Sequence, residues 1–142
     1  MTDDDLQRFV QAQEPRMDDV ASELRAGRKR THWMWFVFPQ LRGLGHSPMA
    51  RHFGIASRDE AVAYLAHPVL GPRLRDCVEL VLAVRGRTAH EVFGSPDDLK
   101  LCSCLTLFRD IDGPGGAFAR ALEKYCDGEP DAATLDLLAN PR

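Results

Sequence analysis

Residues 27–45, with the sequence GRKRTHWMWFVFPQLRGLG, combine cationic, aromatic and amide side chains in a short stretch of chain. The six consecutive large apolar residues from Trp33 to Phe38 exceed what one face of a helix or strand can bury, so this run is expected inside the fold. Buried rings bordered by cationic and amide donors suit an anionic, partly aromatic ligand. The predicted ligand-binding residues of this stretch are Arg28, Lys29, His32, Trp33, Trp35, Gln40 and Arg42.

Each of these residues also has a purely structural interpretation. Arg28 and Lys29 follow the expected end of a helix, where cations complement the helix dipole. Trp33 and Trp35 can both be core residues. His32, with an ordinary pKa of about 6.5, could act as a general acid or base or could form only a structural hydrogen bond. The sequence alone leaves both interpretations open.

A second cluster of reactive side chains lies in residues 98–108, DLKLCSCLTLF. Lys100 and Ser103 are three residues apart and therefore share one side of a predicted helix. A Ser–Lys pair can activate a nucleophile, but the sequence has neither a strained elbow nor an oxyanion signature beside it. The sequence favours Lys100 as a cation that binds a ligand, or as a surface residue, over a partner of Ser103. The candidate catalytic residues are His32, Lys100 and Ser103, and whether the protein is an enzyme stays open.

Four cysteines, at positions 77, 102, 104 and 126, lie in apolar helical patterns. A domain of this length does not require disulfides for its stability, so we expect four reduced thiols. The Cys-x-Cys pair at 102 and 104 lacks the Cys-x-x-Cys spacing of common zinc sites, and no second pair exists. We therefore expect no metal site, and no P-loop or dinucleotide fingerprint points to a cofactor.

The composition of the chain narrows its class. A length of 142 residues, with 44% hydrophobic and 27% charged residues, predicts one globular domain over residues 1–142. No apolar run reaches the roughly 18 residues of a membrane span, and the acidic N-terminus is unlike a signal peptide, so a cytoplasmic protein without a membrane partner is expected. The formal net charge is −3, yet residues 25–51 contain six Lys or Arg and no Asp or Glu. Positive charge is therefore concentrated around the aromatic run.

Apolar periodicity and helix-capping residues predict an all-α fold, a compact single-domain bundle of about seven to nine helices. The longest apolar-periodic element covers about residues 68–85 and is expected at the centre of the bundle. The aromatic run is expected to form one or two helical turns that end near Pro39, although its composition would also allow a strand. Further helix starts are predicted at Ser47, Ser57, Thr88, Ser95 and Asp131.

Several strings of the chain resemble one bacterial family. HWMWFVFPQLRGLG, with DLQRFVQAQ before it and YLAHPVLGPRL, VFGSPDDLKL and TLF after it, is similar to the Domain of Unknown Function 1810. The resemblance extends from about residue 6 to residue 138. It implies a compact, mainly helical single domain, which agrees with the apolar periodicity. The family has no assigned activity, so the resemblance implies no function and no site residues.

Two classes of function are compatible with these residues. The first is a small-molecule site, in an enzyme or a sensor, for an anionic, nucleotide-like or phosphorylated ligand, with Lys100 facing residues 27–45 across a cleft. The alternative is a module that binds a protein or a nucleic acid through the basic segment 25–51. The acidity of the whole chain and the expected burial of its aromatic rings disfavour nucleic acid.

Overall fold

A computed structural model describes residues 3–140, and the predicted all-α fold is confirmed. The described residues form ten helices, one more than the upper end of the predicted range, and no strand; the sole β-bridge among them joins Leu41 to Ile55. The helices are α1 (Asp3–Gln13), α2 (Met17–Arg25), α3 (Met34–Val37), α4 (Pro48–His52), α5 (Arg58–Ala66), α6 (Leu70–Ala83), α7 (Ala89–Phe93), α8 (Asp97–Asp112), α9 (Ala117–Cys126) and α10 (Ala132–Ala139).

Side-chain caps start several of these helices where the sequence predicts them. The Ser47 hydroxyl caps α4, and the Asp131 carboxylate caps α10 by accepting a hydrogen bond from the Thr134 amide at 3.0 Å. Thr88 and Glu91 form the predicted capping box of α7, since each side chain accepts a hydrogen bond from the other residue's amide. These caps depend only on residues three positions apart, which is why local sequence predicts them.

Two predicted helix starts differ in detail from the structure. Ser57 caps α5, but the Glu60 carboxylate accepts a hydrogen bond from the Ala56 amide, not from the Ser57 amide, and also pairs with Arg8 at 2.9 Å. The predicted capping box at Ser57 is therefore only half formed. Helix α8 has Pro96 in the N-cap position and no side-chain cap, so the predicted Ser95 cap is wrong.

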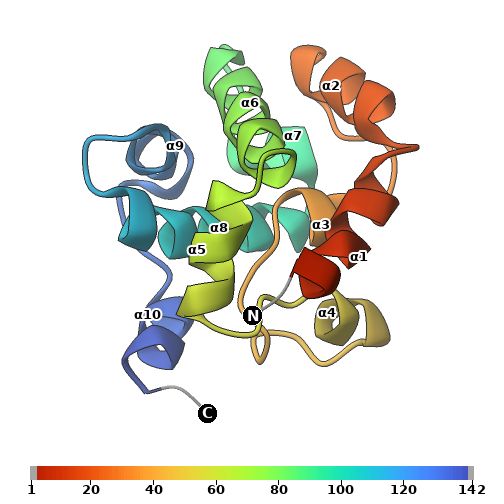
Figure 1. The fold of residues 1–142 in the computed structure, drawn as a ribbon. Helices are drawn as coiled ribbons and strands as arrows, with labels where there is room; N and C mark the ends of the chain where they lie inside the picture. The colour runs from red at the N-terminus through yellow and green to blue at the C-terminus, as the bar shows by residue number, and fades with distance from the viewer. Residues whose placement is uncertain (1–2, 141–142) are drawn as a thin grey trace.

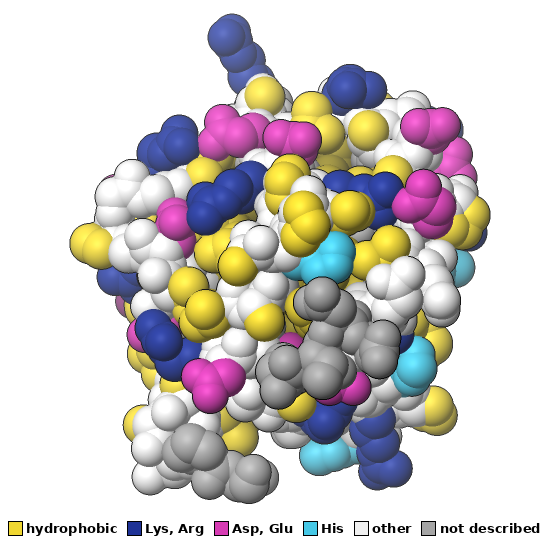
Figure 2. Space-filling model, viewed as in Figure 1, with side chains coloured by type: hydrophobic (Ala, Val, Ile, Leu, Met, Phe, Trp, Pro, Cys, Tyr) yellow, Lys and Arg dark blue, Asp and Glu magenta, His cyan; other side chains and the backbone are white. Residues whose placement is uncertain are grey.

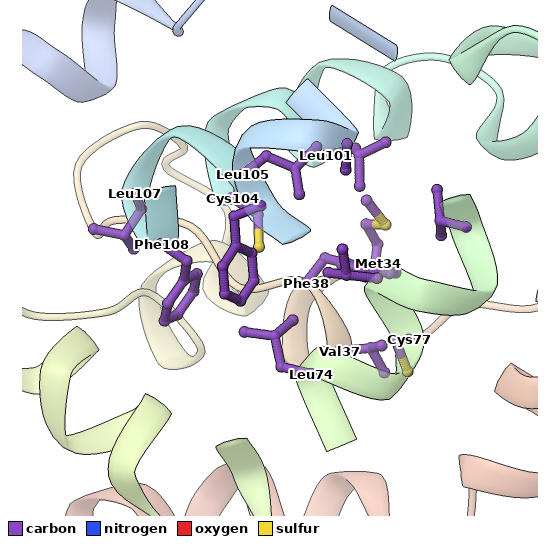
Figure 3. Close-up of a cluster of buried hydrophobic side chains, with 14 of the residues drawn as sticks. Met34, Val37, Phe38, Leu74, Cys77, Leu101, Cys104, Leu105, Leu107 and Phe108 are labelled. Atoms are coloured by element: carbon purple, nitrogen blue, oxygen red, sulfur yellow. The ribbon is translucent and has the colours of Figure 1, made fainter. Parts of the chain in front are cut away.

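One part of the hydrophobic core lies between α6, α8 and α3. Helix α8, which spans 16 residues, crosses the middle of the molecule, and α6, which spans 14 residues close to the predicted 68–85 element, extends from there to the top of the view between α2 and α9 (Figure 1). Figure 3 shows side chains of α8, among them Leu101, Leu105 and Phe108, directed toward Leu74 of α6 and Met34 of α3. Helix α8 buries a run of consecutive residues, Ser103 to Phe108, because other elements cover it on nearly all sides.

The aromatic run forms a single helical turn, α3, and not the strand that its composition also allows. Trp33, Met34, Phe36, Val37 and Phe38 are all less than 7% exposed, as the sequence predicts. Trp35 is the exception, because its side chain is half-buried and reaches the surface. The position of this one ring decides where the run meets solvent.

The cysteines do not all remain thiols. Cys102 of α8 and Cys126 of α9 form a disulfide, so the prediction of four reduced thiols is wrong for this pair. Cys77 and Cys104 are free and buried. Cys102 and Cys126 are 24 positions apart, on either side of a helix–turn–helix, and this separation gives no sign that the two side chains meet.

The surface carries charges of both signs. Lys or Arg and Asp or Glu side chains are interspersed with hydrophobic ones on the face seen in Figure 2. No helix within residues 3–140 has the length and apolar character to cross a bilayer.

Candidate functional site

A cleft of about 400 Å³ lies where the α3–α4 loop faces α8 and the start of α10. We call it the Trp35–Lys100 cleft. Its walls combine apolar side chains with a few polar ones, as ligand sites in proteins commonly do. The lining residues are Trp35, Gln40, Leu44, Gly45, His46, Ser47, Ala50, Pro96, Leu99, Lys100, Ser103, Asp131 and Ala133.

Helix α8 forms one wall of the cleft through a single helical face. Pro96, Leu99, Lys100 and Ser103 have the spacing i, i+3, i+4 and i+7, which places them on one side of the helix. The opposite side of α8 carries the core residues, so the cleft is built on a rigid element. Leu99, 66% exposed, presents an apolar side chain to solvent at this wall.

Two lysines share one carboxylate beside the cleft. The Lys29 ammonium lies 2.9 Å from Oδ2 of Asp97, and the Lys100 ammonium lies 3.3 Å from Oδ1 of the same residue. Each lysine also lies over an indole ring, with Lys29 at 5.2 Å from the centroid of Trp33 and Lys100 at 4.5 Å from that of Trp35. Because one negative charge faces two positive ones, this group retains one net positive charge.

Solvent reaches the two ammonium groups unequally. The Lys29 side chain is 7% exposed, whereas that of Lys100 is 21% exposed and lines the cleft. The positive charge that a ligand in the cleft would meet is therefore that of Lys100. Lys29 does not line the cleft, but it also pairs with Asp97, so the charge of Lys100 is only partly neutralised.

Glu23 of α2 positions the segment that carries Lys29 and Trp33. Its carboxylate accepts hydrogen bonds from the amides of Arg30 and Thr31 at 2.6 and 2.9 Å, from the Thr31 hydroxyl at 2.7 Å and from the Trp33 indole at 3.1 Å. Burial alone would raise the pKa of this carboxyl, but the four hydrogen bonds together lower it from 4.5 to about 2. Glu23 is thus a fixed anion that orders the loop before α3.

The structure brings some of the predicted ligand-binding residues together and separates others. Trp35, Gln40 and Lys100 all line the cleft. Lys29 does not line it, but it pairs with Asp97, which is also the counter-ion of Lys100. The Gln40 amide makes no side-chain hydrogen bond to any other residue of the described range, so its donors and acceptor are available. The remaining predicted residues lie outside the lining: Arg28 and His32 are exposed, Trp33 is fully buried, and Arg42 lines other hollows.

Lys100 and Ser103 both line the cleft but are not paired. The Ser103 hydroxyl donates to the carbonyl of Leu99 at 3.2 Å, while the Lys100 ammonium is engaged by Asp97. The hydrogen bond that a Ser–Lys nucleophile requires is therefore not formed in this structure. His32, the third catalytic candidate, is exposed and away from the cleft.

Sequence reasoning missed two acidic residues of the site. Asp97 is not among the predicted site residues, although its two lysine partners make it the centre of the charged group. Asp131 was expected as the cap of α10, which it is, but it also lines the cleft. The Asp97–Lys100 pair, three residues apart on α8, is local, but Lys29 lies 68 residues from Asp97 along the chain, and the cleft wall that faces Asp131 belongs to another helix.

Two further hollows lie on the other side of the α3–α4 loop. One, of about 460 Å³, is lined by Arg8, Arg42 and Arg51 among others. The guanidinium groups of Arg8 and Arg42 both donate to the Gly54 carbonyl, so two of these cations are committed to closing the end of α4. The other, of about 510 Å³, lies between Leu41 and the α10 residues Leu137 and Leu138. Neither hollow is lined by a Phe, Tyr or Trp ring.

Within residues 3–140, no three His, Cys, Asp or Glu side chains form a group that could hold a metal ion.

Comparisons with known proteins give a family and a fold. A family model described as "Protein of unknown function (DUF1810)" matches residues 3–138. The crystal structure of the conserved hypothetical protein Rv1873 from Mycobacterium tuberculosis is similar over 95% of this chain and 96% of its own, with 58% sequence identity and a TM-score of 0.93. A search of curated proteins found no match.

Proposed function

Because this chain belongs to the DUF1810 family of proteins of unknown function, its activity has to be inferred from its own residues, and we propose that the Trp35–Lys100 cleft binds a small anionic, nucleotide-like or phosphorylated ligand. The observation that carries the proposal is the position of Lys100. Its ammonium lies over the half-buried Trp35 ring, at the edge of a hollow, with only a shared carboxylate as counter-ion.

The ammonium group of Lys100 favours an anion at its end of the cleft. Lys100 donates one hydrogen bond to Asp97 and has further N–H donors available for a phosphate oxygen. A phosphate that reaches Lys100 would form a charge-assisted contact worth about 1.5 to 3 kcal/mol. The Asp131 carboxylate on the opposite wall is already engaged by the Thr134 amide and hydroxyl, which reduces its repulsion of an anion.

The remaining walls favour a ring attached to that anion. Trp35, Leu44 and Leu99 provide apolar surface, and a volume of about 400 Å³ lies within the range of about 300 to 1,000 Å³ typical of small-molecule sites. The unpaired Gln40 amide offers both a donor and an acceptor, which is what recognition of a base edge requires. A nucleotide satisfies all three features at once, whereas free phosphate satisfies only the first.

The two tryptophans allow a direct test by fluorescence. In Trp33→Phe the remaining tryptophan lines the cleft, so titration with AMP should change its emission. In Trp35→Phe the remaining tryptophan is fully buried, and AMP should leave the emission unchanged. Adenosine and inorganic phosphate, each carrying half of the recognised groups, should bind more weakly than AMP.

The contribution of charge is tested in the Trp33→Phe background. Lys100→Met should weaken AMP binding about tenfold or more, because one charge-assisted contact is lost, while the melting temperature stays nearly unchanged. Arg120→Met is the matched control, since Arg120 is an exposed cation paired with Glu79 on another face. Equal affinities for AMP in both variants would contradict the proposal.

The alternative, a binding module that uses the basic segment 25–51, keeps one supporting observation. Arg25, Arg28, Arg30, Arg42 and Arg51 are all exposed. If Trp35 emission responds to a single-stranded oligonucleotide and not to AMP, the binding module is the better account.

A further inference from the structure

The Cys102–Cys126 disulfide lies next to the wall of the cleft, outside the group of residues that would touch a ligand. Cys102 precedes Ser103, a lining residue, on α8, and Cys126 is the last residue of α9. Both side chains are half-buried, whereas the free cysteines, Cys77 and Cys104, are buried. A reagent in solution therefore meets the disulfide before it meets either thiol.

The short segment from Cys126 to Asp131 is tied to α8 at both of its ends. At one end the disulfide joins Cys126 to Cys102. At the other, the Asp131 amide donates to the Thr106 hydroxyl at 2.8 Å, and that hydroxyl donates to the Cys102 carbonyl at 2.8 Å. Cys102 and Thr106 are one turn apart, so two neighbouring positions of α8 hold the segment that ends in the cleft residue Asp131.

The rest of α9 does not depend on the disulfide. The Phe118 ring packs on Phe108 of α8 with centroids 5.6 Å apart, and the Tyr125 hydroxyl donates to the Val81 carbonyl of α6 at 2.6 Å. Loss of the disulfide therefore leaves the α8–α9 packing in place and removes one of the two ties between α8 and the segment that follows Cys126, which then depends on the Asp131–Thr106 hydrogen bond. That segment leads into α10, which contributes Asp131 and Ala133 to the cleft.

We propose that Cys102–Cys126 is a redox-active modification site whose reaction partner is a dithiol, and that its reduction loosens the Asp131 wall of the cleft. A thiolate of the dithiol attacks one protein sulfur, the protein S–S bond breaks, and a mixed disulfide forms. The second thiol of the dithiol then attacks the mixed disulfide and releases the protein sulfur from it. The dithiol is thereby oxidised to a disulfide, and Cys102 and Cys126 are reduced to two thiols, a transfer of two electrons. The effect on the cleft rests on the proposed ligand function, because a wall that must be ordered on binding weakens affinity.

The buried cysteines do not compete in this reaction. Burial raises the pKa of the Cys77 thiol to about 12 and raises that of Cys104 well above its ordinary value. Thiols that stay protonated are poor nucleophiles, so neither resolves the mixed disulfide or exchanges with the pair. The chemistry is confined to the two sulfurs that link α8 and α9.

Alkylation of the native protein tests the site itself. After treatment with dithiothreitol, without denaturant, iodoacetamide should label Cys102 and Cys126 and leave Cys77 and Cys104 unlabelled. Without dithiothreitol it should label none of the four. Labelling of Cys102 before reduction, or of all four cysteines together after it, would overturn the proposal.

Hydrogen exchange and AMP titration test the coupling to the cleft. Reduction should speed exchange of the Asp131 amide at least tenfold and leave the α6 amides unchanged, and AMP should bind about three- to tenfold more weakly. Cys102→Ser/Cys126→Ser should behave like the reduced protein at any dithiothreitol concentration, while Cys77→Ala should respond like the wild type. Unchanged exchange at Asp131 overturns the coupling.

The outcomes separate this proposal from the ligand function. If AMP binds, and binds with equal affinity in both redox states, the coupling is refuted and the ligand function stands. If AMP binds in neither redox state, the ligand function is refuted for that probe. Alkylation then still decides whether the disulfide is redox-active, and hydrogen exchange of the Asp131 amide decides whether it controls the cleft wall.

Discussion

Glu23 is the residue whose chemistry most clearly supports the site without touching the cleft. Glu23→Gln removes the charge from four hydrogen bonds and places an amide N–H₂ among donors. Since hydrogen bonds to a charged group contribute about 1.5 to 3 kcal/mol each, we expect the variant to lose about 2 to 4 kcal/mol of unfolding free energy, measured by urea titration. Glu79→Gln, at an exposed ion pair, should change it by less than about 0.5 kcal/mol.

The same carboxyl should make stability depend on acid pH. Its pKa is about 2 in the folded protein and 4.5 ordinarily, so its contribution is fully present above about pH 4.5 and is lost as pH falls toward 2. Urea titrations between pH 5 and pH 2 should therefore show a smaller decline for Glu23→Gln than for the wild type. Parallel declines would mean that the folded-state carboxyl is not held ionised by these hydrogen bonds.

At the level of elements, α5 and α6 pack so closely that the contact requires a glycine. A Cβ atom at Gly71 would lie far inside van der Waals contact with the Leu65 carbonyl oxygen, a backbone atom that cannot turn aside. Gly71→Ala should therefore cost about 2 to 3 kcal/mol by urea titration, despite the higher helix propensity of alanine. Gly115→Ala, where a Cβ would meet nothing within 4 Å, should be close to neutral. A neutral Gly71→Ala would show that the α5–α6 contact is looser than described.

Sequence predicts the elements well and the contacts between them poorly. The Ser47, Thr88 and Asp131 caps and the α6 periodicity involve residues within one or two turns, so a local pattern specifies them. The shared carboxylate of Asp97 and the Cys102–Cys126 bond depend on how helices cross, and no spacing along the chain contains that information. Trp35, Gln40 and Lys100 were predicted as binding residues from residue type and neighbourhood, and so was Trp33. Only the packing of α3 against α8 shows that the first three line the cleft and that Trp33 is buried.

For the whole molecule, the burial of the aromatic run bears on nucleic-acid binding. Binding of single strands uses exposed rings on which bases stack, whereas Trp33, Phe36 and Phe38 are at most 6% exposed and only Trp35 of this run reaches solvent. We expect oligo-dT to bind more weakly than about 100 μM at physiological salt, measured by fluorescence anisotropy. Tighter binding that falls steeply with salt would favour a module based on segment 25–51.

The central claim is that Lys100 and Trp35 form an anion site, and the most direct measurement of it is a crystal structure with AMP bound. The account predicts a phosphate oxygen within hydrogen-bonding distance of the Lys100 ammonium, with the base between Trp35 and Leu99 and its edge against the Gln40 amide. Crystals of Lys100→Met grown in the same way should lack this density. Phosphate found only beside Arg42 and Arg51, or a cleft that stays empty at millimolar AMP, would contradict it.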